Sequence, residues 1–307
     1  MILLLGSAGQ LGTSIAVALS RKKYDFFAAD NKTLDVTKAE VLHSYISFLK
    51  PKIIINASAY TDVNKAEQEH TTANVVNCKA IQNIQEVCDS IFSSNTQPVI
   101  LHYSTDYVFD GQKTQQYIES DITKPLNHYG RSKRDGENVL IQNYKKFFII
   151  RTSWLFSQYG GNFVKNIVKA LTTTSTQPIS IVNDQFGSPT SAHGLANLTI
   201  LIIEKILEEC SLENFDIKQR YGVYHFSGQN KMTWFDFGNI IRTYCQLHTN
   251  APLRSIRAQK SDVNAQVKRP YDSVLNCNKI SQWLSLSPEF FSWQKDCHYF
   301  IKTLLCK

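Results

Sequence analysis

A glycine-rich turn between a hydrophobic strand and a helix places the strongest constraint on the fold. The apolar run Ile2–Leu5 leads into Gly6-Ser-Ala-Gly-Gln-Leu-Gly12, and apolar residues then recur at helical spacing. Glycines let the backbone turn tightly and approach a pyrophosphate, which free N–H groups at the N-terminus of the helix then bind. The pattern predicts a dinucleotide-binding loop. Its candidate residues are Gly6, Gly9, Gln10, Leu11 and Gly12.

Strands and helices alternate regularly after this loop. Hydrophobic runs predict further strands at 26–29, 52–56, 98–103 and 147–151, with helices between them. Such alternation is typical of an α/β protein with a Rossmann-type doubly wound parallel sheet. We expect a dinucleotide-binding Rossmann domain over residues 1–155. A smaller C-terminal, mainly substrate-binding lobe over residues 156–307 would interleave with the end of the sheet, and the helix expected at 192–209 would pack back on the first domain.

The end of the second strand bears on the choice of cofactor. Asp30 stands where a carboxylate meets the adenosine ribose and repels a 2′-phosphate, which favours NADH. Asn31 and Lys32 follow, and they would accommodate the phosphate if Asp30 turned away. Both NADH and NADPH therefore stay open. Further cofactor candidates follow the second and third strands: Asp35, Val36, Ala57, Ser58 and Ala59.

A tyrosine and a lysine four residues apart are the candidate catalytic pair. Tyr129 and Lys133 would share one face in the first turns of a helix. A lysine charge near a phenol favours the phenolate and moves its pKa toward the range of a general acid or base. The fourth strand ends in Ser104-Thr105-Asp106, so its hydroxyls emerge at the same sheet edge as the glycine loop. A proton donor beside a nicotinamide site suits the reduction of a ketone.

Composition and charge narrow the function classes. The 307 residues carry a net charge of +7, but the basic residues are dispersed, so we expect no nucleic-acid surface. Seven cysteines without metal spacing suggest reduced thiols in the cytoplasm. The N-terminal apolar run is too short for a signal sequence, and Glu204 and Lys205 interrupt the apolar stretch 195–207. We expect no membrane segment.

Together these motifs resemble the extended short-chain dehydrogenases/reductases, and in particular the dTDP-4-dehydrorhamnose reductase branch. The matching pieces are Gly6–Gly12, Ser104-Thr-Asp-Tyr-Val-Phe-Asp-Gly111, Tyr129-Gly-Arg-Ser-Lys133, Arg151-Thr-Ser-Trp154, Gly161-Asn-Phe163, Asp184-Gln-Phe-Gly-Ser-Pro-Thr190 and Arg269-Pro270. The resemblance extends to about Leu275. Gly-Gln-Leu-Gly and Asp-Gln-Phe-Gly-Ser-Pro-Thr are more specific to the branch than the Tyr/Lys pair.

The resemblance implies hydride transfer from NADPH or NADH to the C4 keto carbon of a dTDP-sugar, which gives dTDP-L-rhamnose. Tyr129 would protonate the forming alkoxide, Lys133 would bind the nicotinamide ribose and lower the pKa of Tyr129, and Thr105 would orient the carbonyl oxygen. The implied substrate contacts are Val63, Thr105, Asp106, Trp154, Asn162, Gln185 and Arg269.

Two departures and two alternatives accompany this hypothesis. Some family members bridge a dimer through a metal ion held by glutamates. Ser14 and His193 occupy those places here, so we predict no metal and, at most, a homodimer without that bridge. One alternative is a sugar-nucleotide epimerase or dehydratase that retains its NAD; a dehydratase would need an acid/base carboxylate pair, whereas Thr105-Asp106-Tyr107 supplies only the aspartate. The other is a non-catalytic partner similar to the regulatory subunit of methionine adenosyltransferase.

Overall fold

A six-stranded parallel sheet forms the centre of the computed structural model, which describes residues 1–209, 217–262 and 265–306. The strand order is β2-β1-β3-β4-β5-β10, and every neighbouring pair is parallel. The strands are β1 Ile2–Leu5, β2 Phe26–Ala29, β3 Ile53–Asn56, β4 Val99–Thr105, β5 Phe147–Thr152 and β10 Gly222–His225. The order reverses between β1 and β3, which is where ligands bind in open α/β sheets. The predicted Rossmann-type fold is confirmed.

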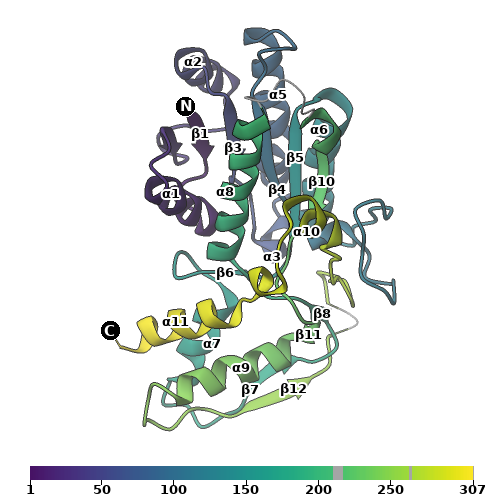
Figure 1. Ribbon diagram of the computed structural model, residues 1–307. Coiled ribbons are helices and arrows are strands. Elements are labelled where there is room, and N and C mark those ends of the chain that lie inside the picture. Colours follow the sequence, from purple (N-terminus) through teal and green to yellow (C-terminus); the bar gives the residue numbers. More distant parts are fainter. Residues whose placement is uncertain (210–216, 263–264, 307) are drawn as a thin grey trace.

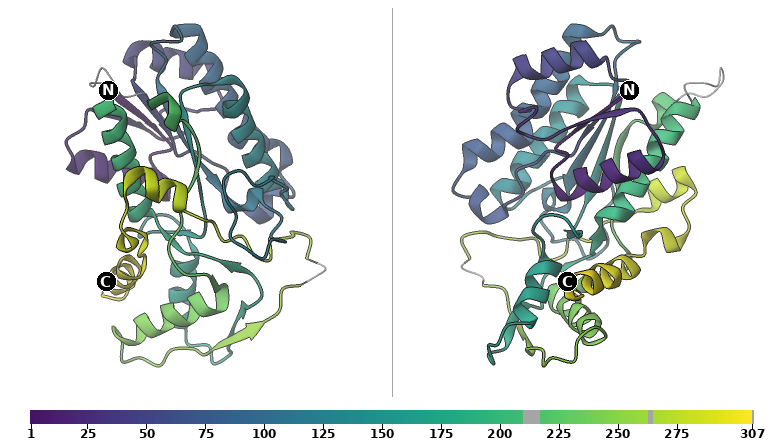
Figure 2. Two further views of the ribbon diagram at one scale, coloured as in Figure 1. Left: turned by 45° about the vertical axis from the view of Figure 1, so that its right-hand side comes forward. Right: turned by 90° about the vertical axis from the view of Figure 1, so that its left-hand side faces the viewer.

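Helices cover both faces of the sheet (Figures 1 and 2). Successive strand residues point to opposite faces, so Ile2 and Leu4 belong to one core and Leu3 and Leu5 to the other. The first core also contains side chains of α1 Gln10–Arg21, α8 Ala192–Glu209 and α10 Asn278–Leu284. The second contains those of α2 Ala39–Leu49, α5 Ala80–Ile91 and α6 His128–Asn143.

The helical segment between β3 and β4 is divided into separate pieces. After α3 Val63–Ala66, the chain forms α4 His70–Asn74, a π-helical turn Val75–Lys79 and then α5. π-Helical turns often occur at functional sites because they redirect one side chain. In this turn Asn77 is buried; it accepts from the Tyr60 N–H (2.8 Å) and donates to Ser132 on α6 (3.0 Å). Asn77 thus fastens the loop after β3 to the helix that carries Tyr129.

A third hydrophobic core, called the lower core below, lies in the part of the chain that Figure 1 draws beneath the carboxyl edge of the sheet. It packs α7 Phe163–Leu171, α9 Trp234–Gln246 and α11 Gln294–Leu305 against β7 Ile179–Val182, which pairs in parallel with β12 Ile256–Gln259. Thr233 is the N-cap of α9 and forms a capping box with Asp236. The shorter elements are η2 Asp106–Val108, β6 Leu155–Phe156, β8 Phe186–Gly187, β9 Thr190–Ser191, η3 Ile217–Arg220, β11 Met232–Thr233 and η4 Pro288–Phe291.

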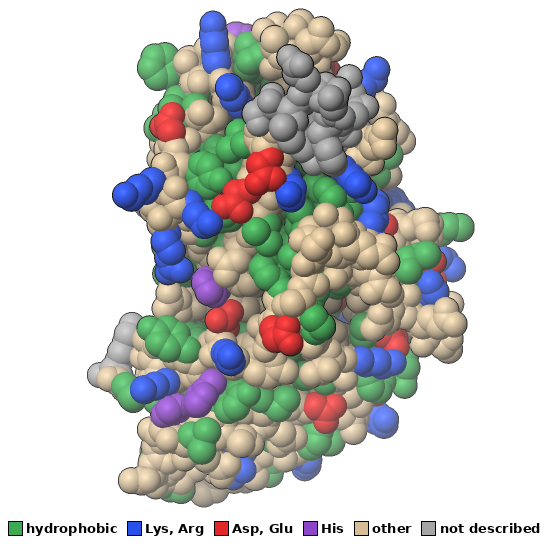
Figure 3. Space-filling view, viewed as in Figure 1, with side chains coloured by type: hydrophobic (Ala, Val, Ile, Leu, Met, Phe, Trp, Pro, Cys, Tyr) green, Lys and Arg blue, Asp and Glu red, His purple; other side chains and the backbone are tan. Residues whose placement is uncertain are grey.

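The division at residue 155 stays a prediction, although α8, β10 and α10 all return to the sheet after that point in the chain. Within the described ranges, no helix has the length and apolar character needed to cross a bilayer. On the face drawn in Figure 3, lysine and arginine side chains are scattered among acidic and uncharged ones.

Candidate functional site

The glycine loop is shaped by close backbone contacts. Gly6 has a φ of 76°, and a Cβ there would lie 2.5 Å from the backbone nitrogen of Ser58. A Cβ on Gly12 would lie 2.1 Å from the carbonyl oxygen of Gly6, so α1 packs directly on the loop. A Cβ on Gly9 would meet only the Gly6 oxygen, at 3.4 Å. The backbone at Gly9 is therefore open to a ligand.

The glycine loop fits a dinucleotide pyrophosphate. Gly9 is the N-cap of α1, and among the described residues no side chain caps this helix, so first-turn N–H groups remain for an anion. Leu11 is buried against the sheet. The Gln10 side chain points elsewhere: its Oε1 accepts from Ser157 Oγ (3.1 Å) and Asn162 Nδ2 (3.0 Å).

Asn162, a predicted substrate contact, is hydrogen-bonded to other parts of the chain. Its Oδ1 accepts from the Lys165 N–H and caps α7, and its Nδ2 donates to the Ser157 carbonyl as well as to Gln10. The residue is 9% exposed. Its polar atoms join the cofactor loop to α7, which favours a structural role.

The other cofactor candidates lie in turns after β2 and β3. Oδ1 of Asp30 accepts from Thr33 N and Oγ1 (both 2.8 Å), and these bonds lower the pKa of the carboxyl. Asp35 makes the same kind of turn with Thr37, whose hydroxyl lies 2.7 Å away, and Val36 is buried between them. Ala57, Ser58 and Ala59 follow β3, and the first two contact Gly6.

Tyr129 and Thr105 come together because α6 packs tightly on the end of β4. Asn127 caps α6 through the Gly130 N–H (2.8 Å), which places Tyr129 in the first turn. A Cβ on Gly130 would lie 2.2 Å from the Tyr107 carbonyl oxygen. Desolvation raises the pKa of the Tyr129 phenol to about 12, and a hydrogen bond with Thr105 opposes this shift. Tyr129 is thus protonated at neutral pH and able to donate.

The amine of Lys133 is not placed as expected for a charge that lowers the pKa of Tyr129. Its Nζ donates to the Tyr103 carbonyl (2.7 Å) and lies 3.3 Å from His102 Nε2, so the side chain reaches into β4. Burial lowers the pKa of Lys133 to about 8. The groups that shift the pKa of Tyr129 are its buried surroundings, Thr105 and Asp106. Spacing along the helix predicted a shared face but not the direction of the amine.

A buried ion pair anchors α6 to the sheet. Arg151 on β5 donates to both carboxylate oxygens of Glu137, at 2.7 Å from Nη2 and 2.9 Å from Nε. The two side chains are 4% and 1% exposed. Because Glu137 follows Lys133 by one helical turn, the pair fixes the part of α6 that carries the lysine.

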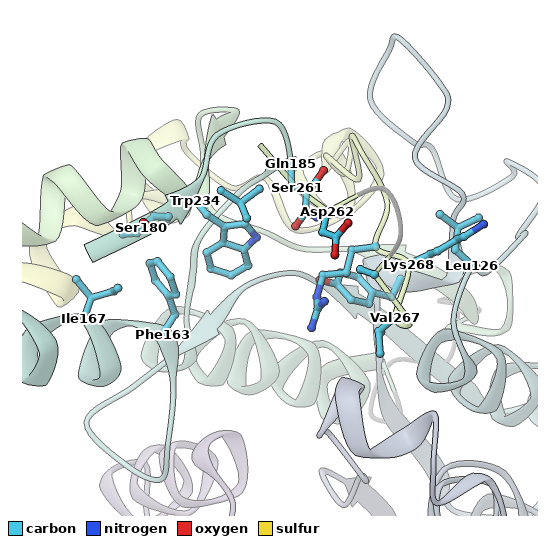
Figure 4. Close-up of a pocket in the computed structure, with 15 residues that line it drawn as sticks. Leu126, Phe163, Ile167, Ser180, Gln185, Trp234, Ser261, Asp262, Val267 and Lys268 are labelled. Atoms are coloured by element: carbon cyan, nitrogen blue, oxygen red, sulfur yellow. The ribbon is translucent and has the colours of Figure 1, made fainter. Parts of the chain in front are cut away.

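A cavity of about 520 Å³ lies between the sheet edge and the lower core. Phe163 and Trp234 lie together on one side of it, and Val267 and Lys268 lie on the other (Figure 4). Tyr107 also lines the cavity, and its ring contacts that of Tyr129 edge to face, with centroids 6.1 Å apart. The candidate proton donor therefore adjoins the cavity.

Only some of the remaining substrate candidates line this cavity. Gln185 and Arg269 line it. Arg269 also donates to Asn64 (2.7 Å), the residue after Val63 at the start of α3. Trp154 stacks on Trp234 with ring centroids 3.5 Å apart. Asp106 is buried next to Thr105, as described below.

Sequence reasoning missed several residues of this region. His102 carried a signal, since it is a polar residue within the buried run of β4. Trp234 and Glu137 carried none, because an aromatic residue at a helix start and a glutamate within a helix are ordinary. Asn77 becomes conspicuous only through the π-helical turn.

Comparisons with known proteins find relatives over almost the whole chain. A family model described as the RmlD substrate binding domain matches residues 1–306. A protein of Aggregatibacter actinomycetemcomitans named dTDP-4-dehydrorhamnose reductase is 37% identical over 298 residues, which cover 96% of each chain. A Bacillus anthracis dTDP-4-dehydrorhamnose reductase solved in complex with NADP aligns with a TM-score of 0.81 at 30% identity, over 97% of this chain and 96% of that one. A dTDP-glucose 4,6-dehydratase from Streptomyces venezuelae, at 15% identity, shares the fold (TM-score 0.77).

Proposed function

This chain belongs to the dTDP-4-dehydrorhamnose reductase family, and we propose that it reduces the C4 keto group of dTDP-4-dehydro-L-rhamnose to give dTDP-L-rhamnose, with NADPH or NADH as the reductant. The observation that carries this proposal is the hydrogen bond of Tyr129 with Thr105, at the sheet edge where the glycine loop also lies. The product is a nucleotide sugar of the kind used in polysaccharide biosynthesis.

The protein's part in the reaction is to hold the ketone and supply a proton. The reduced nicotinamide, when bound over the glycine loop, would supply the hydride. Tyr129 donates its proton to the carbonyl oxygen as negative charge develops there. Thr105 donates a hydrogen bond to the same oxygen. Lys133 would hydrogen-bond the nicotinamide ribose, for which its amine must turn from the Tyr103 carbonyl or use its remaining donors.

The cavity would hold the nucleotide part of the substrate. Arg269 suits a diphosphate, because a guanidinium pairs with phosphate oxygens through two parallel bonds. Gln185 supplies both a donor and an acceptor for a pyrimidine base or a ribose. Trp154 and Val63 would lie against the sugar ring.

The assay that tests the function follows the oxidation of NADPH on addition of dTDP-4-dehydro-L-rhamnose to the purified protein, with and without the preceding epimerase. Turnover supports the proposal. Absence of turnover with either nicotinamide, while the cofactor still binds, would favour the non-catalytic partner. Retention of NAD and conversion of a dTDP-sugar without net oxidation would favour the epimerase or dehydratase.

Cofactor preference yields a prediction about Asp30. We expect NADH to be accepted at least as readily as NADPH, because the ionised carboxylate at the end of β2 repels a 2′-phosphate. Asp30→Asn keeps an oxygen for the Thr33 bonds but removes the charge, so it should raise kcat/KM for NADPH relative to NADH several-fold. Asp25→Asn, at the opposite end of β2, is the matched control. A strong NADPH preference of the unaltered protein would show that Asp30 does not face the ribose.

We place the reaction in the cytoplasm, where the six described cysteines, all free, would stay reduced. The homodimer without a metal bridge also remains a prediction. At the two positions concerned, Ser14 donates to the Gln10 carbonyl and His193 lies 3.4 Å from Asp296.

A further inference from the structure

Asp106 is a buried carboxylic acid, and none of the described residues forms an ion pair with it. It is 2% exposed, and its Oδ1 lies 3.1 Å from Thr105 Oγ1, whereas its Oδ2 accepts from Ser273 Oγ at 2.5 Å. The groups that act on its ionisation are these two hydroxyls and the backbone of residues 106 and 107. Two hydroxyls stabilise a buried carboxylate far less than a guanidinium or ammonium would.

The charged and titratable groups around Asp106 come from three elements. Tyr107 is on η2 with it, and Tyr129 faces it from α6; the Asp106 charge raises the pKa of both phenols. Arg269 is hydrogen-bonded to Tyr107 and is not among the groups that shift the pKa of Asp106. Burial accordingly raises the pKa of Asp106 to about 7.

The Thr105 hydroxyl has one proton, which either Asp106 or a substrate ketone could accept. Its oxygen accepts from the Tyr107 N–H (3.1 Å), and Tyr129 is also hydrogen-bonded to Thr105. Once Tyr129 turns its proton to a bound ketone, Thr105 keeps one lone pair and one proton. If Asp106 is ionised, it accepts that proton, and Thr105 has none left for a substrate carbonyl. If Asp106 is protonated, it can donate to the remaining lone pair instead. Thr105 can then donate to the ketone.

We propose that Asp106 is a positioning residue that acts in its uncharged form: it donates a hydrogen bond to Thr105 and thereby directs the Thr105 proton to the ketone oxygen of the substrate. Its expected role as a direct substrate contact stays a prediction. The inference rests on the proposed reduction for its kinetic consequence only, because the protonation of Asp106 can be measured without substrate.

The kinetic test compares pH profiles of kcat/KM between pH 5.5 and 9. The unaltered protein should lose activity above about pH 7, approaching tenfold per pH unit, as Asp106 ionises. Asp106→Asn carries a permanent N–H donor in place of the acid, so the decline that begins near pH 7 should be absent, and only a later decline from Lys133, whose pKa is about 8, should remain. Asp110→Asn, on the same segment but bonded to Tyr117, is the matched control and should keep the decline.

The test without substrate measures unfolding by urea from pH 4 to 8 for the unaltered protein and Asp106→Asn. The pKa of Asp106 is raised on folding, so the stability from its protonated form is fully present below pH 4 and is lost as pH rises through about 7. The folding equilibrium constant of Asp106→Asn relative to the unaltered protein should therefore rise by up to tenfold per pH unit across this window. A ratio that is flat with pH would overturn the inference even if the reductase activity is confirmed.

Two kinetic outcomes would also contradict it. One is an alkaline decline that is identical in Asp106→Asn; the other is a folded, cofactor-binding Asp106→Asn that is inactive at every pH. If this variant does not fold, Ser273→Ala serves instead. It removes a bond that favours the ionised acid, so the decline should move to higher pH, and an unmoved decline would overturn the proposal.

Discussion

Replacing Tyr129 with phenylalanine should lower kcat by roughly 10²-fold or more, the usual scale of general acid catalysis, while the dissociation constant of NADPH stays nearly unchanged. The phenol is the group that contacts Thr105 at the sheet edge, and its pKa of about 12 keeps it protonated. Phenylalanine preserves the ring that packs on Tyr107 and removes only the proton donor. Steady-state kinetics and a fluorescence titration with NADPH measure the two quantities.

Tyr103→Phe is the matched control. The Tyr103 hydroxyl bonds Thr199 on α8 (2.6 Å), on the face of the sheet away from Lys133, and Lys133 uses only the Tyr103 backbone carbonyl. This variant should keep kcat and lose a modest amount of stability. Near-normal turnover in Tyr129→Phe would end the assignment of Tyr129 as the proton donor.

Replacing Glu137 with alanine should reduce the free energy of unfolding by about 3–5 kcal/mol, because it leaves the Arg151 guanidinium buried without its partner. Urea denaturation at neutral pH measures the loss. Activity should fall as well, since the pair holds the turn of α6 that follows Lys133. The double variant Glu137→Met/Arg151→Met should recover much of the stability, because no charge is then left unpaired.

Glu204→Ala provides the comparison on the surface. Glu204 pairs with Lys22 across α8 and α1 at 2.9 Å, but both side chains are accessible to solvent. Its removal should change stability far less than the loss of Glu137. Equal losses in the two variants would show that burial is not what makes the Arg151 pair important.

The sheet and the cofactor loop could be predicted from the sequence because their signals are local. Each of these features can be recognised within a few residues: the run Ile2–Leu5, the glycines after it and the alternating strands. Elements stabilised by distant contacts could not be predicted in the same way. The strand β12 pairs with β7 about 77 residues earlier in the chain, and its sequence Ile-Arg-Ala-Gln has little hydrophobic character of its own.

The site follows the same rule. The Tyr129 and Thr105 hydroxyls were predicted to converge because each follows a recognisable motif, and the structure brings them into contact. The setting of Asp106 was not predictable, since its partner Ser273 lies 167 residues away. Asn162, which stays a predicted substrate contact, bonds Gln10, 152 residues away. Spacing along the sequence predicts which residues share a helix or strand. It does not predict which distant residues become their hydrogen-bond partners.

Transfer of deuterium tests the central claim most directly. The protein is incubated with dTDP-4-dehydro-L-rhamnose and reduced nicotinamide that carries deuterium at the transferable C4 position, and the sugar product is analysed by mass spectrometry and NMR. We predict one deuterium at C4 of the rhamnose ring, in an amount equal to the nicotinamide oxidised. Product without deuterium at C4, or nicotinamide oxidation without a new sugar, would contradict the account.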